Sequence, residues 1–169
     1  INYNLITKAD ETITADGMRN SAAKLIRSGA ILMAMYGQGV TRGRVALLGI
    51  DACLNQACLA ILPRPSLDSL FLFYFLSLRY EHIRGLAHGA NQQNLNARLV
   101  RSLLVPLPPI TDQRMIAHAL AAVDHKLATE ESRRQALDAL FKTLLHELMT
   151  GRVRVYESET SPELVEATP

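Results

Sequence analysis

The longest regular pattern in the chain is a run of helix-compatible residues, without Gly or Pro, over residues 112–149. Pro108 and Pro109 precede it, Thr111 can serve as its N-cap, and Gly151 lies just past its end, as expected at helix boundaries. At 1.5 Å per residue such a helix would be about 57 Å long, which exceeds the width of a small domain. We therefore predict one continuous helix, most of which cannot be buried within its own domain.

Apolar residues recur along this helix with alternating spacings of four and three. This is the 3.5-residue repeat of a coiled coil, and it continues for about five heptads. A helix lying on its own domain would also be amphipathic, but a small domain could not cover a repeat of this length. We therefore predict that the helix pairs with a second helix. The predicted pairing positions are Ile116, Leu120, Val123, Leu127, Glu130, Arg134, Leu137, Phe141, Leu144 and Leu148.

Two charged residues, Glu130 and Arg134, occupy the centre of this otherwise apolar seam. In an antiparallel pair centred near Ser132, Glu130 of one helix would face Arg134 of the other, whereas a parallel pair would bring like charges together. Burying like charges against each other is costly, so the seam favours the antiparallel arrangement. The flanking charges would complement one another better in a parallel pair, but exposed charge pairs contribute little; they are Lys126, Glu131, Arg133 and Asp138.

Residues 1–110 show short strand and helix patterns separated by polar turns, as is typical of a mixed domain. The expected fold class is α+β: a small mixed α/β domain with a β-sheet core, followed by one long coiled-coil-forming α-helix. We predict strands over 3–6, 30–35, 44–48, 57–62 and 103–107, a turn at 16–17, a helical turn over 22–26, a helix over 67–84 capped by Ser66, and a helix over 97–102.

The net charge of +2 conceals a difference between the two parts of the chain. Residues 1–110 hold 11 Lys or Arg against 6 Asp or Glu, a net charge of +5, whereas residues 111–169 hold 7 against 10, a net charge of −3. The first part is therefore the better candidate for contact with a polyanion, and the second for contact with protein. The acidic, Ser/Thr-rich tail at 152–169 is predicted to be disordered.

Other sequence signals limit the compartment and the chemistry. No apolar run is long enough to cross a membrane, and no basic region followed by an apolar core marks a secretory signal. Cys53 and Cys58 match no metal or redox spacing, which fits a reduced cytoplasmic protein. Because no hydrolase, methyl-donor or phosphate-binding motif is found, we predict no catalytic residue, no metal site and no cofactor.

The side chains best suited to reading DNA are concentrated in two polar loops of the positive segment. In the major groove Arg pairs with guanine and Asn or Gln pairs with adenine, while Lys and Arg also bind phosphates. Gly and Asn equally serve ordinary turns, so these residue types alone leave both interpretations open. The candidates for DNA binding are Gln38, Thr41, Arg42, Arg44, His88, Asn91, Gln92, Gln93, Asn94 and Arg98.

Several stretches, taken in their order along the chain, resemble the specificity subunit of type I restriction-modification systems over about residues 10–155. Three are similar to the distal part of its target recognition domain: Gly37-Gln38-Gly39-Val40-Thr41-Arg42-Gly43-Arg44-Val45, Asn55-Gln56-Ala57-Cys58, and the loop from His88 and Gly89 to Asn94. Others resemble the helical region that follows that domain: Val105-Pro106-Leu107-Pro108-Pro109-Ile110, Asp112-Gln113, Ile116-Ala117, Leu120, Asp124 and Leu148-Met149-Thr150-Gly151-Arg152.

Members of this family usually carry two recognition domains and two long helices in one chain, whereas this sequence shows one of each. The first strands of the domain are also not found before Ile1. We therefore expect a C-terminal fragment or a half-subunit. Its expected parts are a partial target recognition domain at 1–110, a dimerisation and spacer helix at 111–151, and the acidic tail at 152–169.

The resemblance implies a subunit without catalytic activity that reads one half of a bipartite DNA target. Paired antiparallel helices would set the spacing between the half-sites and dock the methyltransferase subunits, through which the restriction subunit joins. The expected partners are double-stranded DNA, these subunits, and a second helix from another copy or from the same parent chain, with no membrane partner. The alternatives are a coiled-coil adaptor that binds only protein, and the recognition module of a fused restriction-methyltransferase enzyme.

Overall fold

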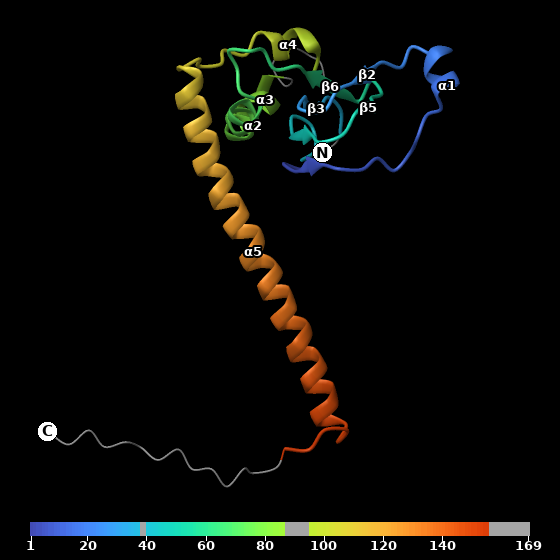
Figure 1. The fold of residues 1–169 in the computed structure, drawn as a ribbon, viewed down its shortest axis with the longest axis vertical. Helices are drawn as coiled ribbons and strands as arrows, with labels where there is room; N and C mark the ends of the chain where they lie inside the picture. The colour runs from blue at the N-terminus through green and yellow to red at the C-terminus, as the bar shows by residue number, and fades with distance from the viewer. Residues whose placement is uncertain (38–39, 87–94, 156–169) are drawn as a thin grey trace, which may run out of the picture. The chain divides into compact units, whose positions relative to one another are not determined.

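The computed structural model describes residues 1–37, 40–86 and 95–155. The chain divides into two compact units, Ile1–Ala122 and Val123–Pro169. The first unit holds two sheets and several short helices, and a single long helix, α5 (Ile110–Met149), contributes residues to both units. Figure 1 shows α5 as one continuous helix. The predicted α+β fold class and the continuous helix are confirmed.

The core of the first unit is a four-stranded sheet with strand order β1-β4-β3-β6. β1 pairs with β4 in parallel, and the remaining neighbours are antiparallel. A separate antiparallel pair is formed by β2 and β5. The bounds are β1 (Leu5–Ile6), β2 (Leu25–Ile26), β3 (Ile31–Ala34), β4 (Val45–Leu48), β5 (Ala52–Cys53) and β6 (Cys58–Ile61).

Strand β3 is buried on both faces, which explains its continuous apolar sequence. Successive side chains of a strand point to opposite faces. Ile31 and Met33 accordingly belong to the larger core cluster, which includes helix residues such as Leu72 and Ile83. Ala30 and Leu32 belong to a smaller cluster with Leu48, Ile6 and Ile26 around it.

Among the described residues, three short helices lie between the last strand and α5: α2 (Ser69–Leu78), α3 (Tyr80–Leu86) and α4 (Ala97–Arg101). The single helix predicted over 67–84 is therefore wrong in detail, because the chain breaks at Arg79, the C-cap of α2. The predicted cap at Ser66 is also wrong. The Asp68 carboxylate caps α2 by accepting hydrogen bonds from the backbone N–H groups of Leu70 (2.9 Å) and Phe71 (3.0 Å).

Three further local predictions are wrong. Residues 103–107 form no strand, and segment 22–26 contains strand β2 in place of a helical turn. The turn expected at 16–17 lies within a short helix, α1 (Ala15–Arg19), capped by the Thr14 hydroxyl. Local sequence does not determine the structure of these segments. Their secondary structure depends on the strand or helix against which each one packs in the fold.

Helix α5 begins at Ile110, so Thr111 lies inside the helix and is not its N-cap. The first turns are held by Gln113, whose side chain is fully buried. Its Oε1 accepts a hydrogen bond from the Asp68 N–H (2.9 Å), and its Nε2 donates to the carbonyls of Ser66 (2.9 Å) and Pro108 (2.8 Å). One amide thus joins the start of α5 to the start of α2.

The helix ends as predicted, with Gly151 in the left-handed region (φ +70°) just after Met149. Within the described part of the chain, no helix is both long enough and apolar enough to span a membrane. The tail predicted to be disordered lies mostly at 156–169, outside the described residues.

Candidate nucleic-acid interface and helix-pairing surface

The two polar segments predicted to contact DNA are joined at one described end of each. Leu95, which follows the second loop, donates its backbone N–H to the carbonyl of Met35, which precedes the first loop (3.2 Å). The fold therefore brings together the ends of two segments that are distant in sequence. Six of the candidates within these loops lie outside the described residues: Gln38, His88, Asn91, Gln92, Gln93 and Asn94.

The returning half of the first loop packs against α3. Gly43 has a positive φ of +85°, and its N–H donates to the carbonyl of Ala34 (2.9 Å). A Cβ atom at this position would lie 3.3 Å from the Ile83 side chain, so a residue larger than glycine would meet both backbone strain and crowding. This close approach places Arg42 and Arg44 next to α3.

Arg44 belongs to a cluster of two tyrosines and two arginines. Its guanidinium lies over the Tyr3 ring (5.6 Å to the centroid), and Nη1 donates to the Asn2 side chain. The Tyr3 and Tyr80 rings meet edge to face at 6.0 Å, and the Arg84 guanidinium lies 5.6 Å from the Tyr80 ring centroid. Such contacts between cations and aromatic rings fix the direction of long arginine side chains.

Tyr80 also connects this cluster to the first loop, because its hydroxyl donates to the backbone carbonyl of Val40 (2.5 Å). Burial raises the pKa of Tyr3, and the neighbouring Tyr80 raises it further, so the Tyr3 hydroxyl stays protonated at neutral pH. Tyr3, Tyr80 and Arg84 are not among the site residues predicted from the sequence. Their role depends on contacts between segments about forty residues apart, which no local pattern reports.

The described DNA-binding candidates differ in their surroundings. Thr41 and Arg98 are exposed, and Arg98 lies in α4. Arg42 and Arg44 are half-buried. Arg44 already contacts Asn2 and Tyr3.

The seam of α5 is exposed along its length in the single chain. Its eight apolar residues are between 41% and 64% exposed. A continuous row of exposed apolar residues is typical of a contact surface, and its pairing with a second helix stays a prediction. They are Ile116, Leu120, Val123, Leu127, Leu137, Phe141, Leu144 and Leu148.

The two charged seam residues have partners within their own helix. Lys126 donates to Glu130 (2.6 Å), and Arg134 donates to both carboxylate oxygens of Glu131 (2.7 and 3.0 Å). Hydrogen bonds from Arg134 and then Gln135 lower the pKa of Glu131 to about 2. Arg134 is therefore held toward one side of the helix, and its predicted contact across a helix pair stays a prediction.

Comparison with known proteins finds relatives that share part of this sequence. Over 114 residues the chain is 27% identical to a Methanocaldococcus jannaschii protein named as the MjaX specificity subunit of a type I restriction enzyme, covering 67% of this chain and 27% of that protein. It is 26% identical over 100 residues to the MjaVIII specificity subunit of the same organism, covering 59% and 24%. The chain thus spans about a quarter of the length of these relatives.

Solved structures share the fold. A chain from a structure on complex assembly and conformational transition of the type I R-M system has a TM-score of 0.60 at 21% identity, covering 72% of this chain and 29% of that one. The HsdS subunit from Thermoanaerobacter tengcongensis has a TM-score of 0.54 at 20% identity, covering 73% and 30%.

A family model described as the type I restriction modification DNA specificity domain matches residues 1–139. The family resemblance inferred from the sequence motifs is thereby confirmed. Since the match covers most of the chain, this protein belongs to the family of type I restriction modification DNA specificity domains.

Proposed function

We propose that this chain reads one half of a bipartite DNA target and that α5 pairs with a second long helix to set the spacing to the other half. The observation that carries the proposal is that the described ends of the two polar segments, Met35 and Leu95, meet in a positively charged part of the chain. The Met35–Leu95 hydrogen bond joins the loop ends, and residues 1–110 carry a net charge of +5. Positive charge attracts the phosphate backbone, and polar side chains on adjacent loops can reach base edges.

The two arginines of the first loop would make different contacts with DNA. Arg44 is held by Asn2 and Tyr3, so we assign it to positioning the loop and meeting a phosphate at a fixed place. Arg42 and Thr41 lie nearer the tip of the loop and are the better candidates for contacts that depend on sequence. Arg98, on a separate helix, would add a phosphate contact.

The spacer role rests on the exposed seam of α5. Pairing would cover eight half-exposed apolar side chains on each helix, at about 1 kcal/mol each. This burial would be the main favourable contribution against the freedom that two chains lose on association. In the antiparallel register centred on Ser132, each apolar seam position faces another apolar position.

The chain would have no catalytic role, and methylation and cleavage would reside in partner subunits. Methyltransferase subunits would dock on the paired helices, and the restriction subunit would join through them. A coiled-coil adaptor would share the seam but not the positive loops, and it would not bind DNA.

The proposal is tested by purifying the chain with candidate methyltransferase subunits and measuring methylation of a random DNA pool. We expect methylation confined to DNA that contains a common short motif. Arg42→Ala at a base contact would weaken binding by about 1–3 kcal/mol and relax one motif position. Arg44→Ala at a phosphate would weaken binding to all sequences and reduce the salt slope by about one unit. Lys24→Ala, an exposed cation in strand-flanking sequence, is the matched control.

Unchanged affinity and unchanged motif in both loop variants would remove the first loop from the DNA interface. Failure of the assembled complex to select any motif would contradict sequence recognition itself.

A further inference from the structure

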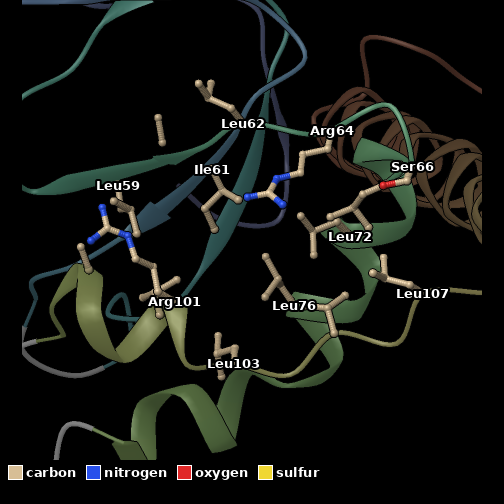
Figure 2. A pocket seen from close by; sticks show the side chains of 15 residues that line it. Leu59, Ile61, Leu62, Arg64, Ser66, Leu72, Leu76, Arg101, Leu103 and Leu107 are labelled. Atoms are coloured by element: carbon tan, nitrogen blue, oxygen red, sulfur yellow. The ribbon is translucent and has the colours of Figure 1, made fainter.

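An apolar groove lies alongside β6, the last strand. Its volume is about 530 Å³, and it is bounded by β6, α2, α4 and the segment 103–107 (Figure 2). The volume is within the range of ligand-binding pockets. Its walls include the buried side chains of Leu72, Leu76 and Val100. The surface is therefore shaped to receive apolar groups.

The groove also exposes one edge of a β-strand. The strand order places β6 at the end of the four-stranded sheet, with β3 as its only neighbour among the described strands. An edge strand presents unpaired N–H and C=O groups that can pair with an added strand. Because Leu59, Ala60 and Ile61 of β6 line the groove, a segment bound there could pair with the strand edge.

Apolar side chains continue from the groove onto the surrounding surface. Leu62 is 63% exposed and Leu107 is 62% exposed, and both line the groove. Leu104, on the segment 103–107, is 92% exposed. A group of exposed leucines beside an apolar groove is typical of a surface that contacts another protein.

Two arginines give the groove its charge. Arg64 and Arg101 line it, and both side chains are exposed (Figure 2). Among the described residues neither guanidinium forms an ion pair with a carboxylate. A bound segment that carries carboxylates beside its apolar residues would therefore complement the site in both respects.

We propose that this groove binds an extended segment of a partner protein in which adjacent apolar side chains are flanked by carboxylates. The segment would pair with the edge of β6, place its apolar residues over Leu72 and Leu76, and set its carboxylates against Arg64 and Arg101. Duplex DNA fits less well, because leucine side chains form neither ion pairs with phosphates nor hydrogen bonds with base edges. This surface does not include the two proposed DNA loops, although α4, which lines it, also carries Arg98, and the inference goes beyond the proposed function.

A probe of this chemistry is available from the sequence, where Leu164 and Val165 stand between Glu163 and Glu166. Binding of a fluorescent peptide with the sequence of residues 160–169 to the full chain would be followed by fluorescence anisotropy. Reversing both charges, Arg64→Glu with Arg101→Glu, is expected to weaken binding at least tenfold. A second peptide with Lys at both glutamate positions should bind the reversed variant better than it binds the wild type.

The matched control is Lys8→Glu with Lys24→Glu, which changes two exposed cations of the same unit and the net charge by the same amount. It should bind the peptide as the wild type does. No binding of the peptide to the wild type at millimolar concentration, or an equal loss in the control variant, would overturn the proposal.

DNA binding by the same variants separates the two surfaces. We expect the reversed variant and the control to bind DNA equally. A loss of DNA binding specific to Arg64→Glu with Arg101→Glu, without loss of peptide binding, would make the groove a DNA surface and overturn the proposal. Absence of DNA binding by the wild type would contradict the proposed function and leave the peptide result standing.

Discussion

Replacing Gln113 by Leu tests whether one buried amide fixes the start of α5. The substitution keeps an apolar stem of similar size but removes all three side-chain hydrogen bonds, to the Asp68 N–H and to the carbonyls of Ser66 and Pro108. Each hydrogen bond contributes about 0.5–1.5 kcal/mol to stability. The backbone N–H and C=O groups that lose their partner would also be left unpaired, which costs further free energy. We therefore expect Gln113→Leu to lower the free energy of unfolding by about 2–4 kcal/mol.

The assay is urea unfolding followed by tyrosine fluorescence, at one protein concentration. The chain has no tryptophan, and four of its five tyrosines precede residue 123, so the signal reports the first unit. In thermal unfolding followed by the same signal, the melting temperature should fall by about 6–12 °C. The control is Gln135→Leu, an exposed residue of the same helix whose amide donates only to Glu131 (3.1 Å). Equal stability of the Gln113→Leu and Gln135→Leu variants would refute the reasoning.

Three further predictions concern the first loop and the helix. Tyr80→Phe removes the hydrogen bond to Val40 and should weaken DNA binding several-fold without changing the melting temperature by more than about 2 °C; unchanged binding would separate this tyrosine from recognition. The pKa of Glu131 is lowered to about 2, so the stability that its carboxylate contributes is complete above about pH 4.5 and is lost as the pH falls toward 2. Circular dichroism should therefore show that Glu131→Gln loses less helix than the wild type over this pH range. Arg134→Glu should weaken the helix pair, and adding Glu130→Arg should restore it if the pair is antiparallel; analytical ultracentrifugation in which the double variant dissociates as readily as the single one would argue against that orientation.

The elements that were predicted correctly are those whose signals are local and long. The apolar runs that became β3, β4 and β6 are uninterrupted because β3 and most of β4 are buried and β6 is half-buried. The long helix has both a repeat and a glycine at its end. The break at Arg79 was missed because α2 and α3 both pack into one core, which makes their combined sequence read as one apolar helix.

The site was predicted less completely, for a physical reason. The loop arginines can be predicted as DNA-binding candidates from their residue type. Residue type does not show that Arg44 contacts Tyr3 or that the Tyr80 hydroxyl bonds to Val40. These contacts join segments about forty residues apart and arise only when the sheet and α3 assemble. The buried role of Gln113 was similarly invisible, although the family resemblance had drawn attention to the Asp112-Gln113 pair.

The most direct test of the central proposal is selection of bound duplexes from a random DNA pool by the full chain with its methyltransferase subunits, followed by sequencing. Recognition of half of a bipartite target by the loops predicts that the selected duplexes share a short motif at a fixed distance from a second one. Arg42→Ala should blur a single position of the first motif and leave the distance unchanged. Selected duplexes with no shared motif, or a wild-type motif that Arg42→Ala leaves intact at every position, would contradict the account.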